Sequence, residues 1–224
     1  MGSPRLLYGH GFASGPESTK GRALSAHLAG LGLALERLDL RRPSMEHLRL
    51  SAMMAHVAER IGGPRDRAVL MGSSLGGLTM ARLAERDARA SGLVLLAPAF
   101  RLAERWRERI GDAELEDWRT RGFREVDDYA TRGRARVDFG FFEELARIDE
   151  EPEPWPDVRV PTLVIHGVHD DTVDVEVSRA FARGRPHVRL VEVDDGHELG
   201  RSIDLICRET TKFLGIWRGS SVAP

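Results

Sequence analysis

The sequence predicts an α/β fold in which about six mostly parallel strands form a sheet with helices on both faces. Short apolar runs alternate with longer segments whose apolar residues recur at helical spacing, and this alternation is typical of βαβ units. The chain has 224 residues, which is enough for one domain with a full-sized core. We therefore expect a single domain over residues 1–217, followed by a small polar tail, 218–224, that is disordered.

In the first half of the chain each predicted strand is followed by a predicted helix. Short apolar runs bounded by glycine or polar residues predict strands at 6–8, 34–40 and 68–71. Apolar residues at every third or fourth position predict helices at 18–31, 44–61 and 75–86.

The second half continues this alternation after one long interruption. Strands are predicted at 93–97, 162–165 and 188–193, and helices at 175–182 and 198–214. Residues 101–156 are too long and too charged to be a simple connection, so we expect them to form an inserted helical lid.

The pattern Gly-x-Ser-x-Gly occurs at residues 72–76, between a predicted strand and a predicted helix, with Ser74 at its centre. A serine hydroxyl is a weak nucleophile unless a sharp turn exposes it to a base and to backbone N–H donors. Glycines at both ends of the pattern remove the Cβ atoms that would collide in such a turn. The pattern alone also fits an ordinary tight turn, so the prediction depends on the rest of the constellation.

Three further motifs follow predicted strands, where the carboxyl ends of a parallel sheet place ligand-binding loops. They are His10-Gly11-Phe12, a loop from His166 that carries Asp170, and Asp195-Gly196-His197 before the last helix. Together with the serine they supply a nucleophile, a carboxylate, an imidazole and backbone donors.

Ser74, Asp170 and His197 occur in the order nucleophile, acid, base. In the predicted triad Ser74 attacks the acyl carbon, His197 transfers the proton, and Asp170 holds the imidazole. The backbone N–H groups of Phe12 and Leu75 are the predicted oxyanion hole. Asp171, Asp195 and, more weakly, Glu104 are the alternative acids.

These motifs resemble those of a small bacterial serine esterase of the α/β-hydrolase superfamily. Residues 10–20 are similar to the start of YqiA-like esterases. The resemblance implies an eight-strand layout, but this chain begins at the strand that feeds the oxyanion loop, so six strands are expected. In the loop that carries Asp170, many relatives have proline after the valine, whereas in this chain Asp174 follows Val173.

The predicted activity is hydrolysis of carboxylic esters or thioesters with small to medium acyl groups, through an acyl-enzyme and without a cofactor. A serine peptidase on the same fold is an alternative, as is a retired hydrolase that binds a ligand or partner. Eight of the fourteen aromatic residues lie within 101–156. We expect Phe139, Phe141 and Phe142 to line the acyl pocket, although such residues equally serve to anchor a lid.

The composition limits the partners and the compartment. The net charge is −2 with both signs interspersed, so neither nucleic acid nor an anionic membrane is an expected partner. Cys207 is the only cysteine, which excludes an internal disulfide, and no apolar signal or membrane span occurs, so we expect a cytoplasmic protein. No spacing predicts a metal site, and nothing predicts an oligomeric state. The preference for arginine over lysine indicates a GC-rich, bacterial genome.

Overall fold

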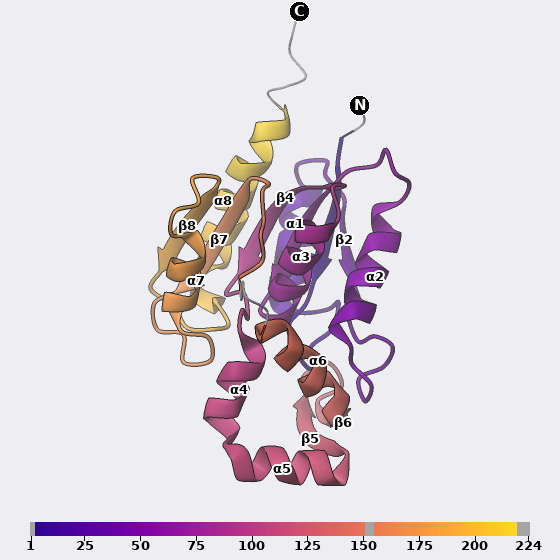
Figure 1. The fold of residues 1–224 in the computed structure, drawn as a ribbon. Helices are drawn as coiled ribbons and strands as arrows, with labels where there is room; N and C mark the ends of the chain where they lie inside the picture. Colours follow the sequence, from indigo (N-terminus) through magenta and orange to yellow (C-terminus); the bar gives the residue numbers. More distant parts are fainter. Residues whose placement is uncertain (1–2, 151–154, 219–224) are drawn as a thin grey trace, which may run out of the picture.

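The computed structural model describes residues 3–150 and 155–218, and its central feature is a parallel sheet. Within the described residues the sheet has six strands in the order β2–β1–β3–β4–β7–β8, and every neighbouring pair is parallel (Figure 1). The strands are β1 (Arg5–Gly9), β2 (Leu35–Leu38), β3 (Ala68–Ser73), β4 (Ala90–Leu96), β7 (Thr162–Gly167) and β8 (Val188–Val193). The predicted fold class and strand number are confirmed.

Helices cover both faces because the strand residues alternate between two apolar clusters. Leu70 of β3 belongs to the cluster under α2 (Leu50–Ile61), α3 (Leu75–Arg86) and α7 (Val175–Ala182), whereas its neighbours Val69 and Met71 belong to the other. That second cluster lies under α1 (Thr19–Ala29) and α8 (Ile203–Arg218). All three strand side chains are fully buried, as expected for a parallel sheet covered on both sides.

The strand order places the site. From β1 the chain passes outward to β2 and then returns to the other side of β1 as β3. At such a switch point the loops after the two strands diverge and leave a crevice at the carboxyl edge of the sheet. The loop after β1 and the turn after β3 meet at this crevice.

The insertion forms a cap at the carboxyl edge of the sheet, and it is not entirely helical (Figure 1). It contains α4 (Leu102–Ile110), α5 (Asp112–Arg121), the antiparallel pair β5 (Phe123–Asp128) and β6 (Gly133–Asp138), and α6 (Phe139–Asp149). The hairpin contradicts the helical lid expected from the sequence. Its strands carry many charged residues and lack a clean apolar alternation, whereas its turn is held by the Asp128 carboxylate, which accepts from the backbone N–H of Ala130 at 3.0 Å.

Two carboxylates on α6 cap helices that are distant in sequence, one in the body of the molecule and one within the cap. Glu144 accepts from the backbone N–H groups of Leu50 at 2.5 Å and Ser51 at 3.2 Å, at the start of α2. Asp149 accepts from those of Ala103 at 2.8 Å and Glu104 at 3.1 Å, at the start of α4. Each carboxylate satisfies N–H groups that have no intrahelical partner.

Two helices begin later than predicted. Helix α2 begins at Leu50 rather than at residue 44. Its start is defined by the Glu144 carboxylate, which accepts from the Leu50 N–H. Before α8, a 3₁₀ turn (Gly200–Ser202) replaces the first predicted residues, because Asp195 holds the Arg201 N–H and the Ser202 hydroxyl at 2.9 Å each. Helix α8 includes Arg218, and the remainder of the tail predicted to be disordered lies outside the described residues.

Candidate active site

Ser74 lies in a sharp turn between β3 and α3. Its backbone has φ 53° and ψ −116°, a conformation that residues with a Cβ rarely adopt. A Cβ added to Gly72 would lie 2.4 Å from the Gly76 carbonyl carbon, and one added to Gly76 would lie 2.2 Å from the Gly9 carbonyl oxygen. The two glycines therefore let the turn close against β1 while Ser74 takes the strained position.

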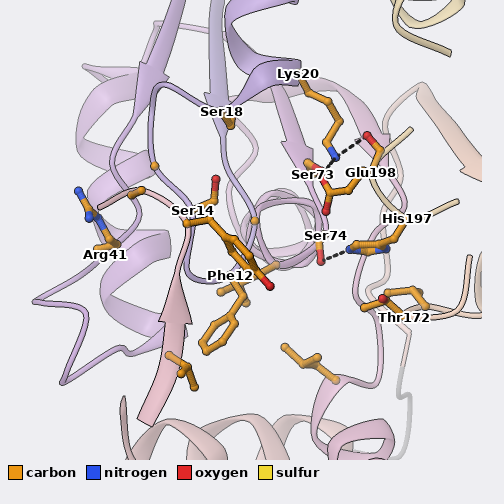
Figure 2. Close-up of a pocket in the computed structure, with 18 of the residues that line it drawn as sticks. Phe12, Ser14, Ser18, Lys20, Arg41, Ser73, Ser74, Thr172, His197 and Glu198 are labelled. Atoms are coloured by element: carbon orange, nitrogen blue, oxygen red, sulfur yellow. Dashed lines mark hydrogen bonds and ion pairs between the residues drawn. The ribbon is translucent and has the colours of Figure 1, made fainter. Parts of the chain in front are cut away.

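Ser74, His197 and Asp170 form a continuous chain of hydrogen bonds. The Oγ atom of Ser74 lies 3.1 Å from Nε2 of His197, and Nδ1 of His197 lies 2.7 Å from Oδ2 of Asp170 (Figure 2 shows the first contact). Because the carboxylate only accepts, Nδ1–H is the donor to Asp170 and Nε2 is left to accept from the serine hydroxyl. This geometry allows His197 to remove a proton from Ser74.

The Asp170 side chain is fully buried and is held as an anion by donors from its own loop. Its Oδ1 accepts from the backbone N–H groups of Thr172 at 2.9 Å and Val173 at 2.7 Å. His166 donates from Nε2 to Asp170 at 3.1 Å and to the Val173 carbonyl at 2.8 Å. Burial alone would raise the pKa of Asp170, but the hydrogen bonds from His166, His197 and Val173 hold that pKa below its usual range.

The alternative acids have other contacts. Asp171 is exposed and accepts from the Thr172 hydroxyl, and Asp195 is occupied by the turn before α8. Glu104 pairs with Arg101 on the cap. Among these four carboxylates, Asp170 is the one that forms a hydrogen bond with the imidazole of His197.

The loop after β1 approaches Ser74 at the position predicted for the oxyanion hole. A Cβ on Gly11 would lie 3.4 Å from the Ser74 Cβ, so this loop lies within van der Waals reach of the serine. Phe12 and Leu75 both line the cleft beside Ser74. The N–H of Leu75, the first residue of α3, has no carbonyl partner within its own helix, which leaves it available to an oxyanion.

His10 and Lys20 brace the loops around the serine. Nε2 of His10 accepts from the Leu40 N–H at 3.0 Å and Nδ1 donates to the Gly11 carbonyl at 2.8 Å, so the imidazole links the loop after β1 to the segment after β2. Lys20 is buried, and its Nζ donates to the Glu198 carbonyl at 2.9 Å and carboxylate at 3.1 Å, directly after His197 (Figure 2). No sequence motif predicts a role for Lys20, although this residue ends the segment that resembles YqiA-like esterases.

A cleft of about 1210 Å³ opens over Ser74 between the body and the cap. Trp106 and Trp118 contribute to its apolar wall, but Phe139, Phe141 and Phe142 do not line it. Phe141 instead stacks behind Phe12, with ring centroids 6.1 Å apart. In contrast to the prediction, the three phenylalanines form a second layer that packs the cap behind the wall.

The model of an uncharacterised protein family, UPF0227, matches residues 5–208, which is most of the chain. The chain belongs to UPF0227. A comparison with curated proteins gives no match.

Solved structures show that this UPF0227 member has the α/β-hydrolase fold. The chain is 19% identical to alpha/beta hydrolase domain-containing protein 10 from mouse, with a TM-score of 0.76 over 96% of this chain and 91% of that one. A structure of Est1E from Butyrivibrio proteoclasticus with bound ferulic acid is 20% identical, with a TM-score of 0.73 over 94% and 88%. A monoacylglycerol lipase from Paleococcus ferrophilus is 20% identical, with a TM-score of 0.67 over 96% of each chain.

Across residues 3–150 and 155–218, His, Cys, Asp and Glu side chains form no group of three or more suited to a metal ion. No helix within those ranges combines the length and apolar character needed to cross a bilayer.

Proposed function

We propose that this protein is a serine hydrolase that cleaves carboxylic esters or thioesters of small to medium acyl groups through an acyl-enzyme. The observation that carries the proposal is the hydrogen-bonded chain from Ser74 through His197 to Asp170, with Ser74 strained at the mouth of a cleft. The likeness of residues 10–20 to YqiA-like esterases and the ferulic acid bound to Est1E, itself a carboxylic acid, give further support.

In the proposed mechanism Ser74 Oγ attacks the acyl carbon while His197 Nε2 accepts the serine proton. The imidazolium is stabilised by Asp170 and then protonates the leaving alcohol or thiol. Water attacks the acyl-enzyme by the same proton transfers in the second half-reaction. The N–H groups of Phe12 and Leu75 would stabilise the oxyanion in both steps.

The test is hydrolysis of p-nitrophenyl esters from acetyl to palmitoyl by wild type and Ser74→Ala. We expect the substitution to lower kcat at least about 10³-fold, because the nucleophile is lost while the binding cleft stays. Ser73→Ala is the matched control, since Ser73 is the buried neighbour in the same turn, and it should retain most of the activity.

Labelling with a fluorophosphonate separates the remaining alternatives. Wild type should be labelled at Ser74, whereas absence of both labelling and turnover would favour a retired hydrolase that binds a ligand. Cleavage of peptide amides in preference to esters would favour a serine peptidase on the same fold.

A further inference from the structure

The cleft over Ser74 carries more positive charge than the chain as a whole. The net charge of the chain is −2, yet the residues that line the cleft include seven lysines and arginines against three glutamates. Low-dielectric walls focus such a charge imbalance into the cleft. An anion entering the cleft would therefore be stabilised there.

Three of these cations already have carboxylate partners. Lys20 pairs with Glu198 at 3.1 Å, Arg41 with Asp39 at 3.1 Å and Arg124 with Glu114 at 3.2 Å. The other four have no carboxylate at ion-pair distance among the described residues, and they are Arg22, Arg105, Arg109 and Arg132. The unpaired cations come from three separate parts of the chain that surround the same cleft.

Arg105 is the least exposed of these four unpaired cations. It extends from α4 of the cap to the loop that carries Asp170, where its Nη1 donates to the Thr172 carbonyl at 2.6 Å. Its Nε is buried and has no hydrogen-bond partner among the described residues, and burial lowers the pKa of Arg105. Asp170 and Asp149 favour its charged form without reaching ion-pair distance, and burial outweighs them, so a further anion in the cleft would stabilise this cation.

Arg109 adds a second like charge on the same side of α4. Positions 105 and 109 are four residues apart and are neighbours on a helix surface, where like charges repel. Both line the cleft, and Arg109 is exposed to solvent. An anion in the cleft would reduce this repulsion and stabilise the partly buried charge of Arg105.

We infer that the preferred substrate is an ester or thioester that carries a carboxylate, recognised by Arg105 and assisted by Arg109. The inference rests on the proposed function, because it adds a substrate class to the same cleft. The carboxylate can belong to the acyl half or to the leaving group, and the two sources are distinguished by experiment.

The test compares substrate pairs that differ in one charged group. For the acyl half the pair is p-nitrophenyl hexanoate and mono-p-nitrophenyl adipate, in which a carboxylate replaces the terminal methyl. For the leaving group the pair is p-acetoxybenzamide and p-acetoxybenzoate. In one of the two pairs we expect wild type to favour the carboxylate at least about tenfold in kcat/KM, after subtraction of spontaneous hydrolysis.

Substitution of Arg105 tests whether this arginine causes the preference for the carboxylate. Arg105→Gln should remove about tenfold of the preference, measured as the ratio of kcat/KM between the charged and the neutral ester, so that any loss common to both esters cancels. Arg107→Gln is the matched control, because this exposed arginine on the same helix lies outside the cleft lining, and the preference should survive. A purely structural role of Arg105 would lower both members of a pair equally.

Two results would overturn the inference. Wild type could cleave both members of each pair equally, or the preference could persist in both Arg105→Gln and Arg109→Gln. If Arg105→Gln does not fold, Arg109→Gln decides, with an expected severalfold reduction of the preference that added salt also produces in wild type. Failure of wild type to cleave any ester would instead refute the proposed function, and this inference with it.

Discussion

The body and the cap differ in how their residues come together. In the body Ser74 directly follows β3, Asp170 lies three residues after β7, and His197 lies four residues after β8. In the cap the contacts that fix its position, such as those of Glu144 on α6 with the start of α2, follow no strand end and no short motif. Residues that follow strand ends can therefore be inferred from short sequence motifs. The shape of the cleft over Ser74, in contrast, depends on how the cap packs against the body.

The largest expected effect tests whether the body's motifs assign the acid correctly. Asp170→Asn should lower kcat by about 10³- to 10⁴-fold, because the amide can no longer hold the reactive tautomer of His197. Steady-state kinetics on the best p-nitrophenyl ester measures the change. Asp171→Asn alters the adjacent exposed residue and should change kcat less than about twofold. A large loss in Asp171→Asn with none in Asp170→Asn would contradict the assignment.

The second prediction concerns the backbone that supports Ser74. Gly76→Ala would place a Cβ 2.2 Å from the Gly9 carbonyl oxygen, so we expect a loss of about 3 kcal/mol or more in the free energy of unfolding. Gly215→Ala has no neighbour within 4 Å and lies in α8, so it should stabilise by about 0.5–1 kcal/mol. Urea denaturation measures both. Equal effects would show that the close approach to β1 is not what requires glycine.

The strands and the candidate site residues of the body could be predicted from the sequence because the site residues follow buried strands. Apolar runs at 68–71 and 162–165 lie within buried strands, and the polar residues after them meet at one edge because parallel strands end together. The cap hairpin at 123–138 was missed because its strands are charged, and the pocket role of Phe141 was misjudged because apolar character does not tell a cleft wall from the layer behind it.

The ionisation of Asp170 predicts a change of stability with pH. Its pKa is lowered in the folded protein because the hydrogen bonds from His166 and His197 outweigh burial. Folding therefore favours the anion, so its contribution is complete above the unfolded pKa of about 3.9 and is lost as the pH falls toward the folded pKa. Urea denaturation from pH 6 to pH 3 should show wild type losing stability relative to Asp170→Asn. A similar shift relative to Asp171→Asn would indicate general charge effects instead.

The fourth prediction tests which aromatic layer would set the acyl specificity of the proposed esterase. Trp106 lines the cleft and packs against Phe12 with centroids 5.2 Å apart, whereas Phe142 is buried behind the wall. Trp106→Leu should change the dependence of KM on acyl chain length severalfold. Phe142→Leu should leave that profile unchanged while lowering the free energy of unfolding by about 1–2 kcal/mol. A shifted profile in Phe142→Leu alone would restore the pocket role predicted from the sequence.

The smallest effect tests whether cap and body unfold as one unit. The Glu144 carboxylate accepts from two N–H groups of α2, and a glutamine in its place has only one acceptor atom and no charge to interact with the helix dipole. Glu144→Gln should therefore lower the free energy of unfolding by about 0.5–1 kcal/mol in a single urea transition. Glu143→Gln makes the same change at the adjacent exposed position and should have no measurable effect. If Glu144→Gln instead splits the transition in two, the cap unfolds before the body, and the contacts that shape the cleft are weaker than those that hold the triad.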